Sequence, residues 1–320
     1  MNFTTLAAKL WTSEPVDLFI DAFRAFDSVL DSLAPTPTAL LPVLDTLNQY
    51  KAPHAQSLPL MNPFHAVAII LTYLFVIHGG KMVMGQFQRV NVSTLAFWHN
   101  IFLTWLSAYM GWGILREAVR NRYSVFTTGV DDSANGWPMA KMLWLFYVSK
   151  IFEFVDTLIM VLKKNNHQIS FLHLYHHSSI LLVTGVSIFY SPGGEVYLSS
   201  MLNCFVHVVM YGYYLLSSMN VKQVVFIKKY ITIIQLTQFC INLVQATFIA
   251  YIFPAYAFVK GVELSSISQF PAVIGFMNWW YMISMLVLFS AFYRQDRTKD
   301  KARLDALKKE SAKKDMKKEL

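Results

Sequence analysis

The chain has 320 residues, of which 55% are hydrophobic and only 14% are charged, and its mean hydropathy is +0.40. This composition excludes an ordinary soluble domain and predicts an all-α integral membrane protein. The net charge of +8 is uneven, because 11 of the 27 Lys and Arg residues follow Phe292. A basic tail at a membrane surface explains this better than nucleic-acid binding. Cys204 and Cys240 both lie in apolar segments, which argues against a disulfide framework.

Residues 1–62 precede the first long apolar segment. They contain amphipathic helical stretches such as Val16–Ile20, and the pattern is broken at Pro35, Pro37 and Pro42. No positively charged segment followed by an apolar core occurs there, so we expect no cleaved signal peptide. We expect this amphipathic segment to stand apart from the membrane domain, residues 63–293, and from the basic tail, residues 294–320.

Seven membrane-spanning helices are predicted, because about 20 apolar residues cross the hydrocarbon core of a bilayer as a helix. The segments are residues 64–83, 96–115, 139–162, 171–190, 196–216, 231–253 and 271–292. Seven spans place the two termini on opposite sides of the membrane. The cations of the tail assign it to the cytosol, so residues 1–62 face the lumen.

Three histidines, His173, His176 and His177, open the fourth predicted span. Their spacing of i, i+3 and i+4 places them on one face of a helix, and titratable groups inside a span usually mark a functional site. Three interpretations stay open: hydrogen-bonded structural histidines, metal ligands, or groups for acid–base and nucleophilic chemistry. Only His207 can join them as a fourth ligand, which suffices for one zinc but not for a di-iron site. A neutral imidazole can also accept an acyl group from a thioester.

The neighbouring spans carry further polar groups. Lys150, Glu153 and Asp156 form a stripe on the third span, which is either a structural ion-pair ladder or a device in which Asp156 orients a catalytic imidazole. Asn203 and His207 share a face of the fifth span. Asn203 then makes either an interhelical hydrogen bond or a bond to an oxyanion.

The same topology places most of these polar groups at mid-depth or in the cytosolic half of the membrane, including Gln235 and Gln238 of the sixth span. This convergence predicts one site that is reached from the cytosol. Cys204 is a rival nucleophile, but no charged residue beside it in the sequence favours a thiolate, so we favour histidine.

Four motifs resemble the ELO family, the fatty acid elongases of the endoplasmic reticulum. They are Lys150-x-x-Glu153-x-x-Asp156-Thr157, His173-x-x-His176-His177, Asn203-x-x-x-His207-x-x-Met210-Tyr211-x-Tyr213-Tyr214 and Thr232-x-x-Gln235-x-x-Gln238. They occur in this order, and the resemblance covers residues 60–295. The residues outside this range carry none of them.

The resemblance implies a polytopic membrane protein of seven transmembrane helices, six of which form a barrel around an acyl-chain tunnel closed toward the lumen. It implies an acyltransferase, a very-long-chain 3-oxoacyl-CoA synthase that joins a long-chain acyl-CoA to malonyl-CoA and releases CO2 and CoA. It implies no metal and no cofactor. Separate enzymes, a 3-ketoacyl-CoA reductase, a dehydratase and an enoyl-CoA reductase, then complete the cycle, and a homodimer is one assembly open to it.

The resemblance also implies roles for the motif residues. In the ping-pong mechanism of the family, His176 carries the acyl group, His207 assists decarboxylation or carbanion attack, Asp156 orients the imidazole and Asn203 helps to hold the thioester. His173 and His177 complete the catalytic set. The expected substrate-binding residues are Lys150, Glu153, Thr157, Tyr211, Tyr213, Tyr214, Gln235 and Gln238.

A finer resemblance concerns the substrate. Gln168, five residues before the box, and Tyr175 within it resemble elongases of polyunsaturated chains rather than saturated ones. The stretches Leu58–His65 and Lys163–Asn166 resemble fungal elongases that act on 18-carbon polyunsaturated acyl-CoA such as γ-linolenoyl-CoA. A saturated or monounsaturated substrate is the alternative.

The final residues, Lys317–Leu320, resemble a dilysine retrieval signal, which functions on a cytosolic tail of an endoplasmic reticulum membrane protein. The tail holds six lysines between positions 308 and 318, so a pair there can also arise by chance. Two further function classes remain open. One is a seven-helix receptor or transporter, and the other is a metal-dependent lipid oxygenase.

Overall fold

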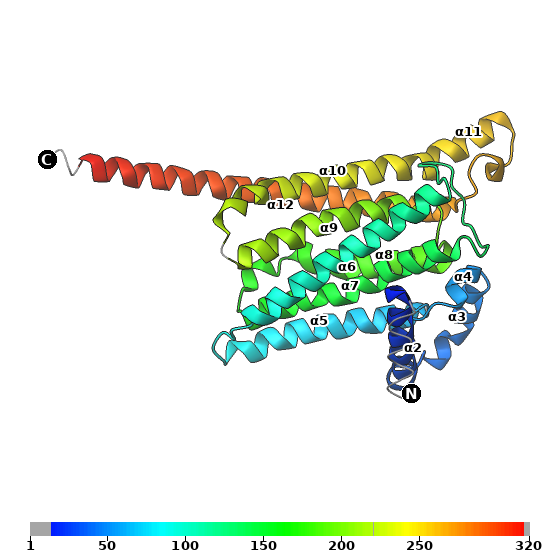
Figure 1. The fold of residues 1–320 in the computed structure, drawn as a ribbon, viewed down its shortest axis with the longest axis horizontal. Helices are drawn as coiled ribbons and strands as arrows, with labels where there is room; N and C mark the ends of the chain where they lie inside the picture. The colour runs from blue at the N-terminus through cyan, green and yellow to red at the C-terminus, as the bar shows by residue number, and fades with distance from the viewer. Residues whose placement is uncertain (1–13, 220, 317–320) are drawn as a thin grey trace.

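The computed structural model describes residues 14–219 and 221–316, and this part of the chain contains helices and no strand. The long helices run side by side (Figure 1). They are α5 (Pro63–Gly85), α6 (Ser93–Arg120), α7 (Trp137–Leu162), α8 (Phe171–Tyr190), α9 (Val196–Ser218), α10 (Lys228–Thr247) and α12 (Ala272–Met316). The shorter elements are α2 (Pro15–Leu33), η1 (Thr38–Leu40), α3 (Leu41–Asn48), α4 (Pro53–Gln56), η2 (Asn166–Gln168), η3 (Lys222–Ile227), η4 (Phe248–Ile252), α11 (Phe253–Lys260) and η5 (Leu264–Ser266).

Six of the seven predicted spans lie inside one of these helices or within one residue of its end, and the sixth span, residues 231–253, covers most of α10, all of η4 and the first residue of α11. Local signals set several boundaries. Asn62 caps α5, since its side chain accepts a hydrogen bond from the backbone of Phe64, and Ser170 caps α8 by accepting one from His173. The sixth segment runs longer than predicted, because α10 continues through the π-helix η4 into α11.

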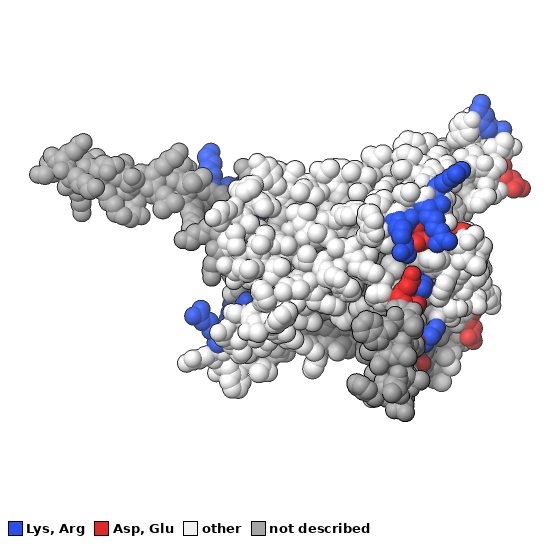
Figure 2. All heavy atoms as spheres, viewed as in Figure 1, with Lys and Arg blue, Asp and Glu red and all other residues white. Residues whose placement is uncertain are grey.

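Three helical segments are long and apolar enough to cross a membrane: Pro63–Gly85, Tyr230–Lys260 and Ala272–Thr298. Only 17 to 33% of their most apolar windows is buried within the protein, so most of this apolar surface faces outward. Figure 2 shows a broad face without charged side chains. A few Lys and Arg side chains lie at its left end, and Lys, Arg, Asp and Glu side chains gather toward its right end. Such a surface suits a bilayer.

Helix α7 lies in the middle of the bundle. Its residues 139–150 are all buried, including Lys141 and Lys150. Because α7 carries charged residues, it is not among the three helices that are apolar enough to cross a membrane by composition. These charged residues lie where neighbouring helices cover α7, so they need not face lipid. A helix buried on all sides is a firm support for a functional site.

Helix α6 packs along α9 at close range. A Cβ added at Gly111 would lie 3.1 Å from Cβ of Cys204, so glycine allows the two helices to approach. Cys204 itself is only 1% exposed. The contact therefore gives this cysteine a packing role.

The N-terminal segment packs across one end of the bundle (Figure 1). Helix α2 buries Val16, Ile20 and Phe23, as its amphipathic pattern predicted. Lys141 of α7 binds Glu14 and Asp17 with both N···O distances at 3.1 Å.

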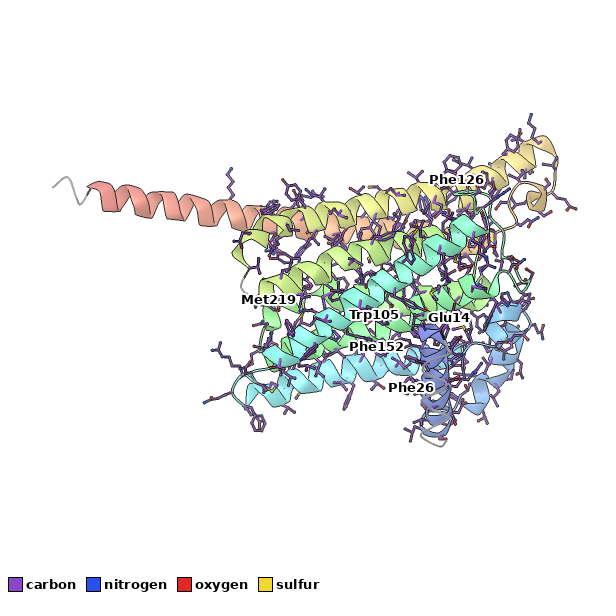
Figure 3. The ribbon with its side chains drawn as sticks, in the orientation of Figure 1. Glu14, Phe26, Trp105, Phe126, Phe152 and Met219 are labelled. Atoms are coloured by element: carbon purple, nitrogen blue, oxygen red, sulfur yellow. The ribbon has the colours of Figure 1, made fainter. Side chains whose placement is uncertain are left out.

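Aromatic rings extend this contact. Phe152 of α7, labelled in Figure 3, lies near α2 in that view. Its ring meets Phe23 of α2 and Phe102 of α6 edge-on. The prolines act differently from one another. Pro35 and Pro37 follow the end of α2, but Pro42 lies in the first turn of α3, where its missing N–H costs nothing.

At the other end, α12 extends past the bundle to Met316. The predicted dilysine signal, Lys317–Leu320, lies outside the described residues.

Candidate active site

Charged and polar side chains from α7, α8 and α9 meet inside the bundle around Glu153. Lys150 Nζ donates to Glu153 Oε1 at 2.8 Å and to Asn203 Oδ1 at 3.1 Å. His207 Nδ1 lies 3.2 Å from Glu153 Oε1, and His177 Nδ1 lies 4.0 Å from Glu153 Oε2. Lys150 and Glu153 are 1% and 2% exposed. A charge pair buried this deeply is tolerable only because each member is paired and hydrogen-bonded.

Asp156 belongs to a second group. Its Oδ1 lies 3.2 Å from Nε2 of His99 on α6, and its Oδ2 accepts a hydrogen bond of 2.7 Å from the hydroxyl of Tyr211. This arrangement differs from the expectation that Asp156 orients a catalytic imidazole, since the imidazole that it meets is that of His99. Asp156 lies about 4.5 Å farther along α7 than Glu153 and about 60° around the helix axis, so it reaches other neighbours.

The three histidines of the box remain neighbours but have different partners. The ring centroids of His173 and His177 are 4.4 Å apart, and those of His176 and His177 are 5.5 Å apart. His173 Nε2 lies 2.7 Å from the Thr157 hydroxyl, which in turn lies 2.9 Å from the hydroxyl of Tyr73. The box thus links the Glu153 group to a hydroxyl chain on α5 and α7.

His176 faces α12. Its Nδ1 lies 3.3 Å from the hydroxyl of Tyr281, to which Ser179 also donates at 3.4 Å. The ring of Phe289 packs against it edge-on. Nδ1 is therefore occupied, and Nε2 is the nitrogen left for a substrate.

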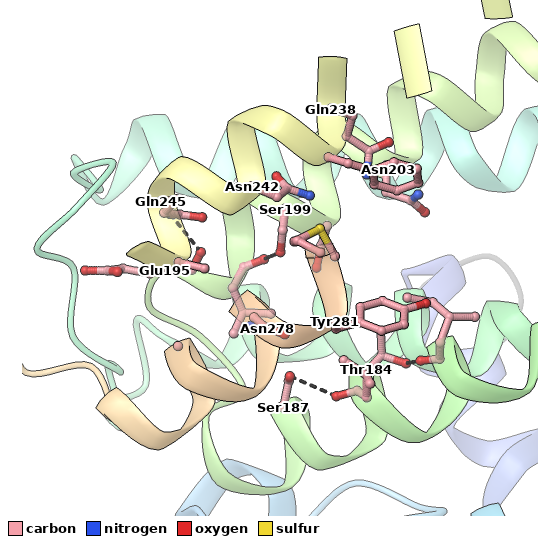
Figure 4. Close-up of a pocket in the computed structure, with 18 of the residues that line it drawn as sticks. Thr184, Ser187, Glu195, Ser199, Asn203, Gln238, Asn242, Gln245, Asn278 and Tyr281 are labelled. Carbon is pink, nitrogen blue, oxygen red and sulfur yellow. Dashed lines mark hydrogen bonds between the residues drawn. The ribbon is translucent and has the colours of Figure 1, made fainter. Parts of the chain in front are cut away.

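A cavity begins at His176 and Asn203 and extends between α8, α9, α10 and α12 (Figure 4). Helix α8 contributes apolar and polar side chains in equal number, and α10 contributes amide side chains. Residues lining it include Phe146, His176, Ile180, Val183, Thr184, Ile188, Glu195, Ser199, Asn203, Gln238, Asn242, Gln245, Phe270, Asn278 and Tyr281. The lining runs along α8 from His176 to Ile188, about 18 Å of helix, with His176 and Asn203 at one end. A cavity of this length suits an extended chain that carries a carbonyl group at that end.

Comparison with known proteins agrees with this geometry. The family model described as "ELO: GNS1/SUR4 family" matches residues 58–304. The chain belongs to the ELO family.

Similar proteins of other organisms are named as fatty acid elongases. This ELO protein is 37% identical over 279 residues to "Fatty acid elongase 6" of Leishmania major, which covers 86% of this chain and 70% of the relative. It is 34% identical over 240 residues to "Very long chain fatty acid elongase 5" of Mus musculus, and 35% identical over 240 residues to that of Homo sapiens. Each of these two comparisons covers 74% of this chain and 76% of the relative.

These findings make the ELO protein a membrane-embedded condensing enzyme of fatty acid elongation that takes acyl-CoA substrates. The receptor, transporter and oxygenase alternatives lose their support. Within the described residues, no group of three or more His, Cys, Asp and Glu side chains is arranged to hold a metal ion.

The remaining ELO motif residues divide between the interior and the surface. Gln238 lines the cavity, whereas Gln235 lies beside Met210 with Nε2 3.9 Å from the sulfur. Tyr213 and Tyr214 pack ring against ring, and Tyr214 is exposed. Tyr214 is therefore placed for contact with groups outside the bundle, whereas Tyr211 is buried against Asp156.

Four residues of the site were missed by the sequence reasoning. No role was predicted for His99, and nothing near it in the sequence indicates its contact with Asp156. Tyr73 and Tyr281 come from distant helices and carry no local signal. Asn242 was detectable, because it follows Gln238 by four residues on the same face of a helix.

Proposed function

We propose that this ELO protein is a 3-oxoacyl-CoA synthase that joins a long-chain acyl-CoA to malonyl-CoA. The products are CO2, CoA and a 3-oxoacyl-CoA two carbons longer. The observation that carries the proposal is the joint placement of His176 and Asn203 at one end of a long cavity. A thioester carbonyl placed there meets an imidazole, and its hydrocarbon chain follows the cavity.

The first half-reaction uses His176. When Nδ1–H donates to the oxygen of Tyr281, the lone pair of Nε2 is free to attack the thioester carbonyl. The carbon–sulfur bond breaks, CoA leaves as a thiolate that takes up a proton, and an acyl-imidazole remains. The proposed role of Asn203 is to hold the thioester, with its amide positioned by Lys150.

The second half-reaction uses His207, whose proposed role is to assist the decarboxylation of malonyl-CoA or the attack of the carbanion. Its Nδ1 faces Glu153, which fixes the tautomer and leaves Nε2 free. Malonyl-CoA loses CO2, the resulting carbanion attacks the acyl carbon, and the bond to His176 breaks. We assign to Glu153 the orienting role that the motif comparison gave to Asp156. In this proposal Asp156 supports the site through His99 and Tyr211.

The proposed architecture is seven spans, six of them around the acyl tunnel, with the tail in the cytosol. The agreement of the helices with the predicted spans supports it. The proposed location is the endoplasmic reticulum membrane, where a 3-ketoacyl-CoA reductase, a dehydratase and an enoyl-CoA reductase act on the product. A homodimer and a dilysine signal at Lys317–Leu320 complete this proposal.

The proposed substrate is an 18-carbon polyunsaturated acyl-CoA such as γ-linolenoyl-CoA, and a saturated or monounsaturated chain is the alternative. Purified protein incubated with radiolabelled malonyl-CoA and γ-linolenoyl-CoA, without NADPH, is expected to form 3-oxoacyl-CoA. The same mixture with His176→Ala is expected to form none. Absence of product from folded wild-type protein with both γ-linolenoyl-CoA and palmitoyl-CoA would overturn the proposal.

A further inference from the structure

The cavity has an unusual wall for a hydrocarbon chain. Helix α10 presents three amide side chains to it, Gln238, Asn242 and Gln245, at i, i+4 and i+7 (Figure 4). This spacing is that of one helical face. The three residues are only 5 to 6% exposed. Amides hidden from water inside an acyl cavity need a reason, because an unpaired polar group in such a place is costly.

Two of the three amides keep unused hydrogen-bonding capacity. Gln245 has a structural role, since its Nε2 donates to the backbone oxygens of Val125 at 2.8 Å and Glu195 at 3.3 Å. In contrast, Gln238 Oε1 and Asn242 Oδ1 are buried and have no hydrogen-bond partner among the described residues. These two oxygens are available to whatever fills the cavity.

The hydroxyl groups on the neighbouring walls behave differently. Thr184 and Ser187 of α8 donate to backbone oxygens of their own helix, at 2.6 and 2.9 Å. Ser199 of α9 does the same at 3.1 Å. Their polar capacity is used locally. Among the described residues that line the cavity, the buried polar atoms without a partner are these two amide oxygens of α10 and, at the opposite end of the cavity from His176, the carboxylate oxygens of Glu195.

The position of the amides relative to His176 follows from aromatic contacts. Phe289 packs against both His176 and Phe239. The turn of α10 that carries Gln238 and Phe239 therefore lies close to the imidazole of His176. Asn242 lies one turn, about 6 Å, farther along the helix. A chain bound through a carbonyl at His176 passes Gln238 first and Asn242 next.

We propose that Gln238 and Asn242 form a recognition wall for cis double bonds near the thioester end of the acyl chain. This inference rests on the proposed condensation of acyl-CoA with malonyl-CoA. A saturated segment at this wall leaves both amides unpaired. A methylene-interrupted polyene offers π faces that accept from amide N–H groups, and polarised C–H groups between double bonds that contact amide oxygens.

The wall therefore favours polyunsaturated over saturated chains chiefly by penalising the saturated ones. It also distinguishes unsaturated chains by the positions of their double bonds. Double bonds close to the carbonyl reach the wall, whereas double bonds confined to the methyl end lie beyond it.

The test compares γ-linolenoyl-CoA with stearoyl-CoA, which has the same length, in the condensation assay with the purified full chain. Asn242→Leu and Gln238→Met replace each amide by an apolar side chain of similar size. Each is expected to reduce the ratio of kcat/KM for the two substrates by at least about fivefold, mainly through better use of stearoyl-CoA. Thr237→Leu, on the outward face of α10, is the matched control and is expected to keep the wild-type ratio.

The outcomes separate the two proposals. No condensation by folded wild-type protein with either substrate overturns the proposed function. A wild-type preference for stearoyl-CoA overturns the recognition wall alone. An unchanged ratio of kcat/KM for the two substrates in either active variant also overturns the recognition wall. Two variants are used so that the test still works if one of them fails to fold.

Discussion

Glu153 Oε1 lies 2.8 Å from Lys150 Nζ and 3.2 Å from His207 Nδ1, so one carboxylate oxygen serves a cation and an imidazole together. The lysine and the imidazole are both partners of this buried carboxylate. The stripe on α7 therefore contains a buried ion pair, and in our proposal Glu153, in place of Asp156, orients a catalytic imidazole.

Glu153→Gln is expected to reduce condensation by at least about a hundredfold, because the imidazole of His207 loses its orienting charge. It is also expected to lower the free energy of unfolding by about 3 kcal/mol, since Lys150 is left as a buried charge. Product formation and thermal unfolding in detergent measure the two effects.

A matched control for this change is Glu14→Gln. Glu14 also pairs with a lysine, Lys141, but it is half exposed. The expected loss of stability is below about 1 kcal/mol, with kcat unchanged. The double variant Lys150→Met/Glu153→Gln removes both buried charges. If it recovered stability and activity together, the orienting role of Glu153 would be wrong.

Tyr281→Phe is expected to lower kcat about tenfold and to leave KM nearly unchanged. The substitution removes only the hydroxyl that faces His176 Nδ1, so one hydrogen bond is lost and the tautomer of the imidazole is no longer set. Tyr175→Phe removes a comparable bond between α8 and α12, to Ser284 at 3.0 Å, and is expected to have little effect. Equal kcat values for the two variants would contradict a positioning role for Tyr281.

Cys204→Ala is expected to keep condensation activity within a few-fold of wild type, at a stability cost of about 1 kcal/mol. The reason is that Cys204 is buried against Gly111 on the α6 side of α9. Loss of an acyl-carrying nucleophile would instead reduce kcat by at least about a thousandfold. Such a loss in a folded Cys204→Ala protein would show that Cys204, and not His176, carries the acyl group.

Glu195 gives the chain a pH-dependent stability. Its carboxylate oxygens are buried and have no partner within the described residues, and burial raises the pKa of Glu195 to about 8. Between the ordinary value of 4.5 and about 8, the folded chain holds a proton that the unfolded chain has lost. Stability from this group is therefore full below pH 4.5 and declines as the pH rises to about 8.

Glu195→Gln keeps the shape of the side chain and removes the titration. The expected result is a flatter profile of unfolding temperature against pH between 5 and 8 than in wild type. Parallel profiles for the two proteins would show that Glu195 ionises in the folded chain as it does in the unfolded one.

The helices were accessible to prediction because their signals are local. Runs of apolar residues, the cap at Ser170 and the prolines near 35–42 lie within a few positions of the boundaries that they mark. The gathering of Lys150, Glu153 and His207 was also foreseeable, since helical spacing and membrane depth bring them to one level.

The partners within the site were not accessible in the same way. Which imidazole each of Asp156 and Glu153 meets depends on how α7 is rotated against α6, α8 and α9, and no local pattern encodes that rotation. His99 and Tyr281 are separated from their partners by 57 and 105 residues along the chain. The amides of α10 had a readable period, yet only the cavity shows that they face its interior.

The two tasks of this protein fall on different helices. In our proposals, α7, enclosed by its neighbours, bears the charges that the chemistry needs, whereas α10 bears the amides that meet the hydrocarbon chain and has an apolar outer side. A substitution on α10 can alter which chain is accepted without moving a charged atom on α7. Substrate range is therefore free to diverge during evolution while the catalytic machinery stays the same.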